Sequence, residues 1–223
     1  MKRQGSFVIT CILFVSMLLP GSAFASVHET DIEAILSGMT LEQKVGQMMA
    51  VAFRVWKEIP TEEEATVENI ERQEPEAVSV TELNQQIREC LAKYHFGSVI
   101  LFAENCQGAE QTLRLVQDMQ AANQAGGGIP MLFSIDQEGG SVARLGFGTS
   151  GPGNMALAAT GDPENAAAMA AVYGEELKLL GIHADYAPVL DVNNNPNNPV
   201  IGVRSFSDDP ETVSKYGLYP GLA

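Results

Sequence analysis

One segment decides how this chain is interpreted: Met131-Leu-Phe-Ser-Ile-Asp136-Gln-Glu-Gly-Gly140-Ser-Val-Ala-Arg144-Leu145. Residues 131–135 are bulky and apolar, so we predict a buried strand that ends at Asp136. A carboxylate in this place either caps a tight turn of the protein or is offered to a ligand. Gly139 and Gly140 permit a sharp turn and leave room for a ligand to approach closely. The segment therefore has the form of an active-site strand end.

Strand and helix patterns alternate along the rest of the chain. We expect strands near residues 49–53, 98–103, 131–135 and 184–188, and helices over 31–39, 40–48, 80–94, 109–125 and 162–180. The helix at 40–48 begins with a capping box of Thr40 and Gln43. Apolar strands that alternate with helices indicate parallel βα units, which form either an open doubly wound sheet or a closed barrel.

The positions of the polar residues favour the barrel. The candidate polar side chains all follow expected strands: Glu104, Asn105, Asp136, Asp191, Asn193 and Arg204. Active sites of TIM-type barrels lie at this end of the strands. A glycine-rich G-x-G-x-x-G turn after a first strand, typical of dinucleotide-binding sheets, is missing. We therefore predict an α/β fold of the TIM-type (β/α)8 class, of which only about the first half is present, since such a barrel needs about 250 residues.

The first 25 residues have the pattern of a secretory signal peptide. Lys2 and Arg3 precede an apolar run over 7–19, and Ala23-Phe-Ala25 is a small-x-small cleavage site. We expect residues 26–223 to be the exported domain, secreted or periplasmic. Because the apolar run is short for a transmembrane helix, we expect no stable membrane anchor.

Composition narrows the choice of partners. A formal net charge of −15 argues against nucleic acid. Residues 58–76 are rich in Glu and are expected to form an acidic surface insertion. Cys90 and Cys106 either pair in an oxidising compartment or remain free thiols. Metal-ligand spacing is absent from the sequence, because there is no CxxC or HxxxH and the three histidines lie far apart.

The segment Asp136-Gln-Glu-Gly-Gly-x-Val-x-Arg144-Leu resembles the signature of glycoside hydrolase family 3, in the branch of bacterial β-N-acetylglucosaminidases. Four further segments resemble that family in the same order: Met39-Thr-Leu-Glu-Gln-Lys-Val-Gly-Gln-Met48, Gly97-Ser-Val-Ile-Leu-Phe102, Asp185-Tyr-Ala-Pro-Val-Leu-Asp191-Val-Asn and Asn198-Pro-Val-Ile-Gly202-Val-Arg204-Ser-Phe206. The matches cover most of residues 31–217. The resemblance also implies a TIM-type barrel.

Three substrate-binding residues are implied by this resemblance. Asp136 matches the family position that accepts hydrogen bonds from sugar hydroxyls, and Arg144 and Arg204 match two arginines beside the same sugar ring. Arginine suits this task because its rigid fork offers several donors and stays charged. Structural alternatives remain: Asp136 as a turn cap, and Arg144 in a salt bridge that holds the turn at residues 139–140. For Arg204 the alternative is an ion pair with Asp208 or Asp209.

Other polar and aromatic residues are given structural roles. We interpret Glu138 as a brace of the loop rather than a general acid. Asp191 is interpreted as scaffold for the Arg204 loop, with direct contact to the sugar as the alternative. His183 is expected to pack in the core. Trp56, Phe102 and Phe147 are suited to stacking on a sugar, but aromatic residues at this density are more often core.

By the resemblance, the Asp nucleophile and the Asp-His acid/base pair would lie beyond Ala223, so no catalytic residue is assigned within the chain. The hypothesis is an exported, retaining β-N-acetylhexosaminidase acting on N-acetylglucosamine-containing glycosides, in an incomplete copy that needs no cofactor. The alternatives are an inactive carbohydrate-binding remnant or a β-glucosidase of the same family. The expected partner is a small carbohydrate, and the sequence makes no prediction of the oligomeric state.

Overall fold

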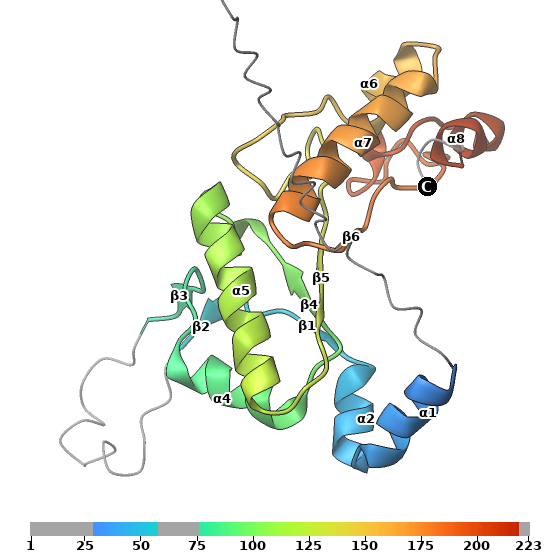
Figure 1. Ribbon diagram of the computed structural model, residues 1–223. Helices are drawn as coiled ribbons and strands as arrows, with labels where there is room; N and C mark the ends of the chain where they lie inside the picture. The colour runs from blue at the N-terminus through green and yellow to red at the C-terminus, as the bar shows by residue number, and fades with distance from the viewer. Residues whose placement is uncertain (1–28, 58–75, 219–223) are drawn as a thin grey trace, which may run out of the picture. The chain divides into compact units, whose positions relative to one another are not determined.

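The computed structural model describes residues 29–57 and 76–218 (Figure 1). The chain divides into two units, residues 1–39 and 40–223. The first contains helix α1 (Glu29–Gly38), in agreement with the expected short helix. The predicted signal peptide lies outside the described residues, as does the acidic insertion apart from Glu76, which is exposed.

The second unit is built on a parallel sheet. Its strands follow the order β1 (Ala50–Val51), β4 (Ser98–Leu101), β5 (Leu132–Ile135) and β6 (Ala184–Asp185), and each neighbouring pair is parallel. All four predicted strands are confirmed, and each is shorter than expected. Strand β4 ends early because the Asn105 side chain accepts a hydrogen bond from the backbone N–H of Phe102, at 3.0 Å. That amide then points into a turn rather than into the ladder.

Helices connect the strands, and their limits follow local signals. They are α2 (Leu41–Gln47), α4 (Gln85–Tyr94), α5 (Ala109–Ala125), α6 (Asn154–Ala159), α7 (Glu164–Leu179) and α8 (Pro210–Gly217). Thr40 and Gln43 form the predicted capping box of α2. Helix α4 begins at Gln85 rather than near Val80, because the Asn84 side chain caps it by accepting from Ile87 N. The short helix α6 was not predicted.

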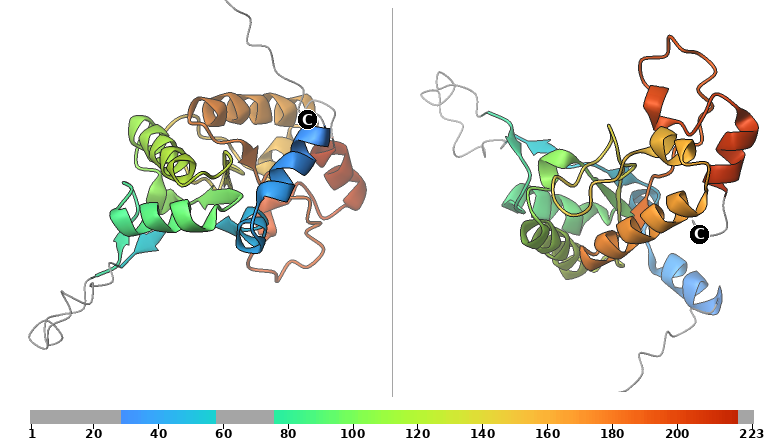
Figure 2. Two further views of the ribbon diagram at one scale, coloured as in Figure 1. Left: turned by 60° about the horizontal axis from the view of Figure 1, so that its bottom comes forward. Right: turned by 90° about the horizontal axis from the view of Figure 1, so that it is seen from above.

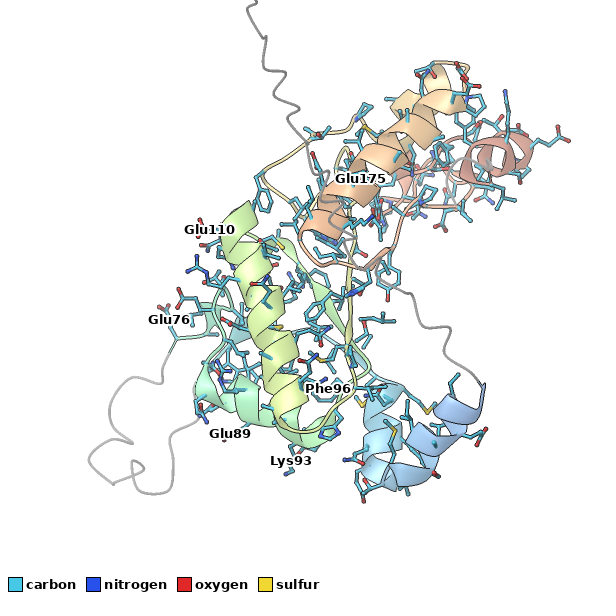
Figure 3. The ribbon with its side chains drawn as sticks, in the orientation of Figure 1. Glu76, Glu89, Lys93, Phe96, Glu110 and Glu175 are labelled. Atoms are coloured by element: carbon cyan, nitrogen blue, oxygen red, sulfur yellow. The ribbon has the colours of Figure 1, made fainter. Side chains whose placement is uncertain are left out.

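One face of the sheet is covered by helices. Val99, Leu101, Phe133 and Ile135 are buried on this face, where α4 and α5 lie side by side (Figure 1). The helices contribute the buried side chains of Ile87, Leu91, Leu115 and Met119. Charged residues of these helices, such as Glu89, Lys93 and Glu110, are exposed, whereas Phe96 is buried (Figure 3). On the opposite face, which lines the interior in a closed barrel, Leu132 is 56% exposed.

A two-stranded antiparallel ribbon, β2 (Val55–Trp56) and β3 (Val78–Ser79), was not predicted from the sequence. Its strands have two residues each, too few for a period-2 pattern to be recognised. The ribbon pairs the segment before residue 58 with the segment after residue 75.

The elements after β5 form a second cluster. Leu157, Ala166, Phe206, Val213 and Tyr216 pack together, and they join α6, α7 and α8 to the loop before α8. Figure 2 shows these three helices gathered together. The fold is thus the predicted α/β class, with a parallel four-stranded sheet as in the first half of a TIM-type barrel. Within the described residues, no helix is long and apolar enough to cross a membrane.

Candidate sugar-binding site

Asp136 and Arg144 form an ion pair at the end of strand β5. The Arg144 Nη2 atom lies 2.9 Å from Asp136 Oδ2. The side chains are 23% exposed for Asp136 and 28% for Arg144. The pair is therefore partly shielded from water, which strengthens the attraction between the two charges. A ligand from solvent can still reach it. The expected salt bridge of Arg144 across the turn thus exists, and its partner is the other predicted site residue.

Arg204 forms a two-pronged ion pair with Glu138. It lies in the 3-10 helix η2 (Gly202–Arg204), and its Nε and Nη2 atoms donate to Glu138 Oε2 and Oε1 at 2.9 and 2.7 Å. The alternative of an ion pair with Asp208 or Asp209 is wrong. Glu138, whose side chain is only 5% exposed, braces the loop as interpreted from the sequence.

The neighbouring backbone holds Arg204 in place. The buried Asn154 side chain donates to the Arg204 carbonyl at 2.8 Å, and the Ser205 hydroxyl donates to the Asp191 carbonyl. The pKa of Arg204 is raised, first by its bonds to Glu138 and also by the charges of Glu138, Asp191 and Asp136. The Asp191 segment thus supports the Arg204 loop, and Asp136 is close enough to act on Arg204 electrostatically.

The three predicted site residues therefore belong to one charge network. Asp136 and Arg144 follow strand β5, and Arg204 comes from a loop about 60 residues later. Two carboxylates and two guanidinium groups form two ion pairs there, so acceptors and donors for hydroxyl groups lie close together. That these residues bind a sugar stays a prediction.

Phe102 lies beside this network. Its ring is 4.5 Å from the Arg54 guanidinium carbon and 5.3 Å from that of Arg144, both within cation-π range. Arg54 is itself paired with Glu104.

Trp56 and Phe147 pack against the main core, as the sequence suggested. Asn105 is buried and donates to the Phe53 and Val80 carbonyls, so its role is structural.

The expectation that His183 packs in the core is wrong. Its side chain is exposed, and its Nδ1 atom accepts a hydrogen bond from Phe133 N at 3.1 Å. His183 precedes the edge strand β6, where apolar neighbours in sequence do not ensure burial.

Cys90 and Cys106 are free thiols. Burial raises the pKa of Cys106 to about 11.

Two residues without a predicted role support the site. The Asp185 carboxylate accepts from Gln137 N at 2.8 Å, and the buried Gln137 side chain accepts from Arg144 N and Leu145 N. Asp185 and Gln137 also line a cavity of about 260 Å³ that includes Tyr173 and Met169 of α7. The role of Asp185 could have been suspected from the sequence, because it is a charged residue within the apolar strand expected at residues 184–188.

Burial raises the pKa of Asp185 from 3.8 to about 6, helped by the charges of Asp136 and Glu138 and opposed by the bond from Gln137 N. A raised carboxyl pKa means that the folded state holds the proton more tightly than the unfolded state. The contribution of Asp185 to the free energy of unfolding is therefore complete below about pH 4 and is lost as pH rises to about 6. In urea unfolding, Asp185→Asn should show less of this decline than the parent chain. Parallel pH profiles of the two proteins would contradict the raised pKa.

The Arg204–Glu138 pair should be a major contributor to stability. Arg204→Ala leaves the nearly buried Glu138 carboxylate without its partner, which typically costs about 3 to 5 kcal/mol. Arg114→Ala is the matched control, because Arg114 pairs with Glu110 on the surface of α5. Loss of such an exposed helical pair costs about 0.3 to 0.5 kcal/mol. Equal unfolding free energies for the two variants would show that the pair between Arg204 and Glu138 is not needed.

No cluster of metal-ligating side chains occurs in the part of the chain that the structure describes. The site chemistry available there consists of carboxylates, guanidinium groups and buried amides.

Comparison with known proteins gives a consistent result. Residues 40–220 match the Glycosyl hydrolase family 3 N terminal domain. The chain is 38% identical over 206 residues to β-hexosaminidase A of Pseudoalteromonas piscicida, covering 88% of this chain and 32% of the relative. It is 38% identical over 133 residues to β-hexosaminidase LpqI of Mycobacterium tuberculosis, covering 58% and 33%.

Solved structures agree. A glycoside hydrolase family 3 β-N-acetylglucosaminidase from Paenibacillus sp. FPU-7 matches with a TM-score of 0.68 and 37% identity, covering 82% of this chain and 31% of that one. The chain thus spans about a third of the length of the curated relatives named above. Because residues 40–220 match the family model and the relatives found are of the same kind, the chain belongs to glycosyl hydrolase family 3 and carries its N-terminal barrel domain in part.

Proposed function

We propose that this chain supplies part of the sugar-binding site of an exported, retaining β-N-acetylhexosaminidase. The substrates would be small glycosides that contain N-acetylglucosamine, such as cell-wall fragments or chitin oligomers. The observation that carries the proposal is the network of Asp136, Arg144, Glu138 and Arg204 at the carboxyl ends of the strands. The relatives named β-hexosaminidase support this choice of sugar.

Export rests on the signal-peptide pattern of residues 1–25. A retaining glycosidase needs two catalytic carboxyl groups about 5 to 5.5 Å apart. The family resemblance assigns neither of them to residues 1–223. The proposal for this polypeptide is therefore recognition of a sugar, with catalysis dependent on residues that the resemblance places later in the family's barrel.

A β-glucosidase of the same family and a purely carbohydrate-binding protein are the competing functions. Titration of residues 26–223 with N-acetylglucosamine and with glucose, followed by two-dimensional NMR, separates them from the proposal. We expect N-acetylglucosamine to shift the amide signals of residues 136–145 and 202–206 at lower concentration than glucose does. Preference for glucose would favour a β-glucosidase. If the chain still shows no hydrolysis after it is joined to the remaining part of a family barrel, a carbohydrate-binding protein is favoured.

Arg144→Lys should weaken this binding, because an ammonium group does not reproduce the planar fork of donors. Arg114→Lys makes the same chemical change in an exposed pair with Glu110 and should leave binding unchanged. Saturating sugar that shifts no signal in these two segments, or equal binding by both variants, would contradict the proposed site.

A further inference from the structure

The loop from Asp136 to Arg144 is fixed at both ends by one side chain. Gln137 is 1% exposed, and its Oε1 atom accepts from Arg144 N at 2.9 Å and from Leu145 N at 3.1 Å. One buried oxygen thus joins the start of the loop to its end. Because Arg144 is bound through its backbone, its side chain stays available for Asp136.

Asp185 fixes the same loop from the neighbouring strand. Its Oδ1 atom accepts from Gln137 N at 2.8 Å, and strand pairing places Asp185 opposite Ile135. The register of β5 and β6 therefore delivers this carboxylate next to the peptide unit between Asp136 and Gln137. This bond holds the peptide unit that follows Asp136.

The middle of the loop is held by bonds that do not involve Asp136 or Arg144. Gly139 and Gly140 have positive φ angles of 81° and 58°, a region that glycine adopts without strain. The backbone bond from Gly140 N to Gly151 O, at 2.9 Å, anchors the turn but contacts neither Asp136 nor Arg144. Val142 N donates to Gly139 O at 3.2 Å, and Arg204 holds the Glu138 carboxylate. The bonds of Gln137 and Asp185 are those made next to Asp136 and Arg144 themselves.

Asp185 and Gln137 do not belong to the ion pair of Asp136 and Arg144, and they face a different space. Both line the cavity beside α7, together with Tyr173, whereas Asp136 and Arg144 do not line it. The groups that act electrostatically on Asp185 are Asp136 and Glu138. Neither forms a hydrogen bond with the Asp185 side chain in the structure, so Asp185 influences the site through the backbone of Gln137.

We propose that Gln137 and Asp185 are positioning residues: they hold the Asp136 carboxylate and the Arg144 guanidinium at the separation in which both bind one sugar. The sugar in this statement rests on the proposed function. The positioning itself concerns the ion pair and is measurable without any ligand.

The first experiment compares three variants of residues 26–223 by NMR. Gln137→Met removes the acceptor at similar side-chain volume, and Gln137→Glu restores it. Gln120→Met is the control, because Gln120 also bonds to the backbone: it donates to the Met131 carbonyl at 2.8 Å and accepts from Met131 N at 2.9 Å, at the other end of β5. The measured quantities are amide hydrogen exchange and the side-chain Nη–H signals of Arg144, because its Nη2 atom makes the bond to Asp136.

Gln137→Met should speed exchange at Arg144 and Leu145 by about tenfold, as expected for loss of a hydrogen bond. It should also move the Arg144 Nη–H signals toward those of an unpaired arginine, whereas Gln137→Glu and Gln120→Met should not. If Gln137→Met leaves the Arg144 signals unchanged, or if Gln120→Met changes them equally, the positioning role is wrong.

The second experiment covers the case in which Gln137→Met does not fold. Asp185→Asn keeps an acceptor for Gln137 N and Asp185→Ala removes it, so only the alanine variant should speed exchange at Gln137 about tenfold and release Arg144. Equal behaviour of the two would overturn the proposal. N-acetylglucosamine affinity is then measured in parallel: we expect it to fall with Asp185→Ala. If wild-type protein keeps the ion pair but binds no sugar, the proposed function fails while the positioning role stands.

Discussion

Residues 26–223 expressed alone should show no measurable hydrolysis of an aryl β-N-acetylglucosaminide. Neither catalytic role is assigned to a residue of this polypeptide, and loss of a nucleophile or its proton-transfer partner typically lowers kcat by on the order of 10⁴-fold or more. The measurement is release of the aryl alcohol by purified protein. As a positive control, residues 40–220 are placed in β-hexosaminidase A of Pseudoalteromonas piscicida in exchange for its matching segment.

Suppose that the chimera is active and the isolated polypeptide is inactive. This result would support the proposal that this chain binds the sugar while residues later in the barrel catalyse the reaction. Turnover by the isolated polypeptide that Asp136→Ala abolishes would contradict it, because the catalytic carboxylate would then lie within the loop after β5.

In the same chimera, Asp136→Ala should lower kcat/KM by about 10² to 10⁴-fold. Hydrogen bonds to charged groups contribute roughly 1.5 to 3 kcal/mol each, and a carboxylate accepts from two hydroxyl groups at once. Removal of Asp136 also leaves Arg144, its partner at 2.9 Å, without a counter-charge. Both effects act on the bound sugar and on the transition state.

Glu110→Ala is the control for this prediction, since it removes an exposed carboxylate from the pair with Arg114 and should leave kcat/KM unchanged. Urea unfolding of each variant separates lost binding from lost folding. An Asp136→Ala chimera with unchanged kcat/KM would return Asp136 to the role of a turn residue.

The sequence was most informative where the physical signal is local. Alternating apolar strands and helices with capping residues give the element order and the parallel sheet, and the motif after residue 135 places Asp136 at a strand end. The helix over 109–125 matches its prediction because Gly126 and Gly127 follow a long periodic pattern. Side-chain periodicity and caps depend on near neighbours, so they are readable without a structure.

The partners of the charged residues were determined only by the tertiary structure. Arg204 lies close in sequence to Asp208 and Asp209, yet it binds Glu138, which is 66 residues away. The choice depends on which loops meet at the ends of β5 and β6. A buried carboxylate also needs a partner more than an exposed one does.

The supporting bonds of the loop show the same limit. Asp185 reaches Gln137 because β5 and β6 are neighbours in a fixed register. Gln137 closes the loop because its buried side chain accepts from Arg144 N and Leu145 N. The sequence by itself determined the fold class and the candidate loop, since both follow from local patterns of apolar and turn-forming residues. Only the tertiary structure decided which side chains hold that loop, because strand pairing brings together residues that no local pattern connects.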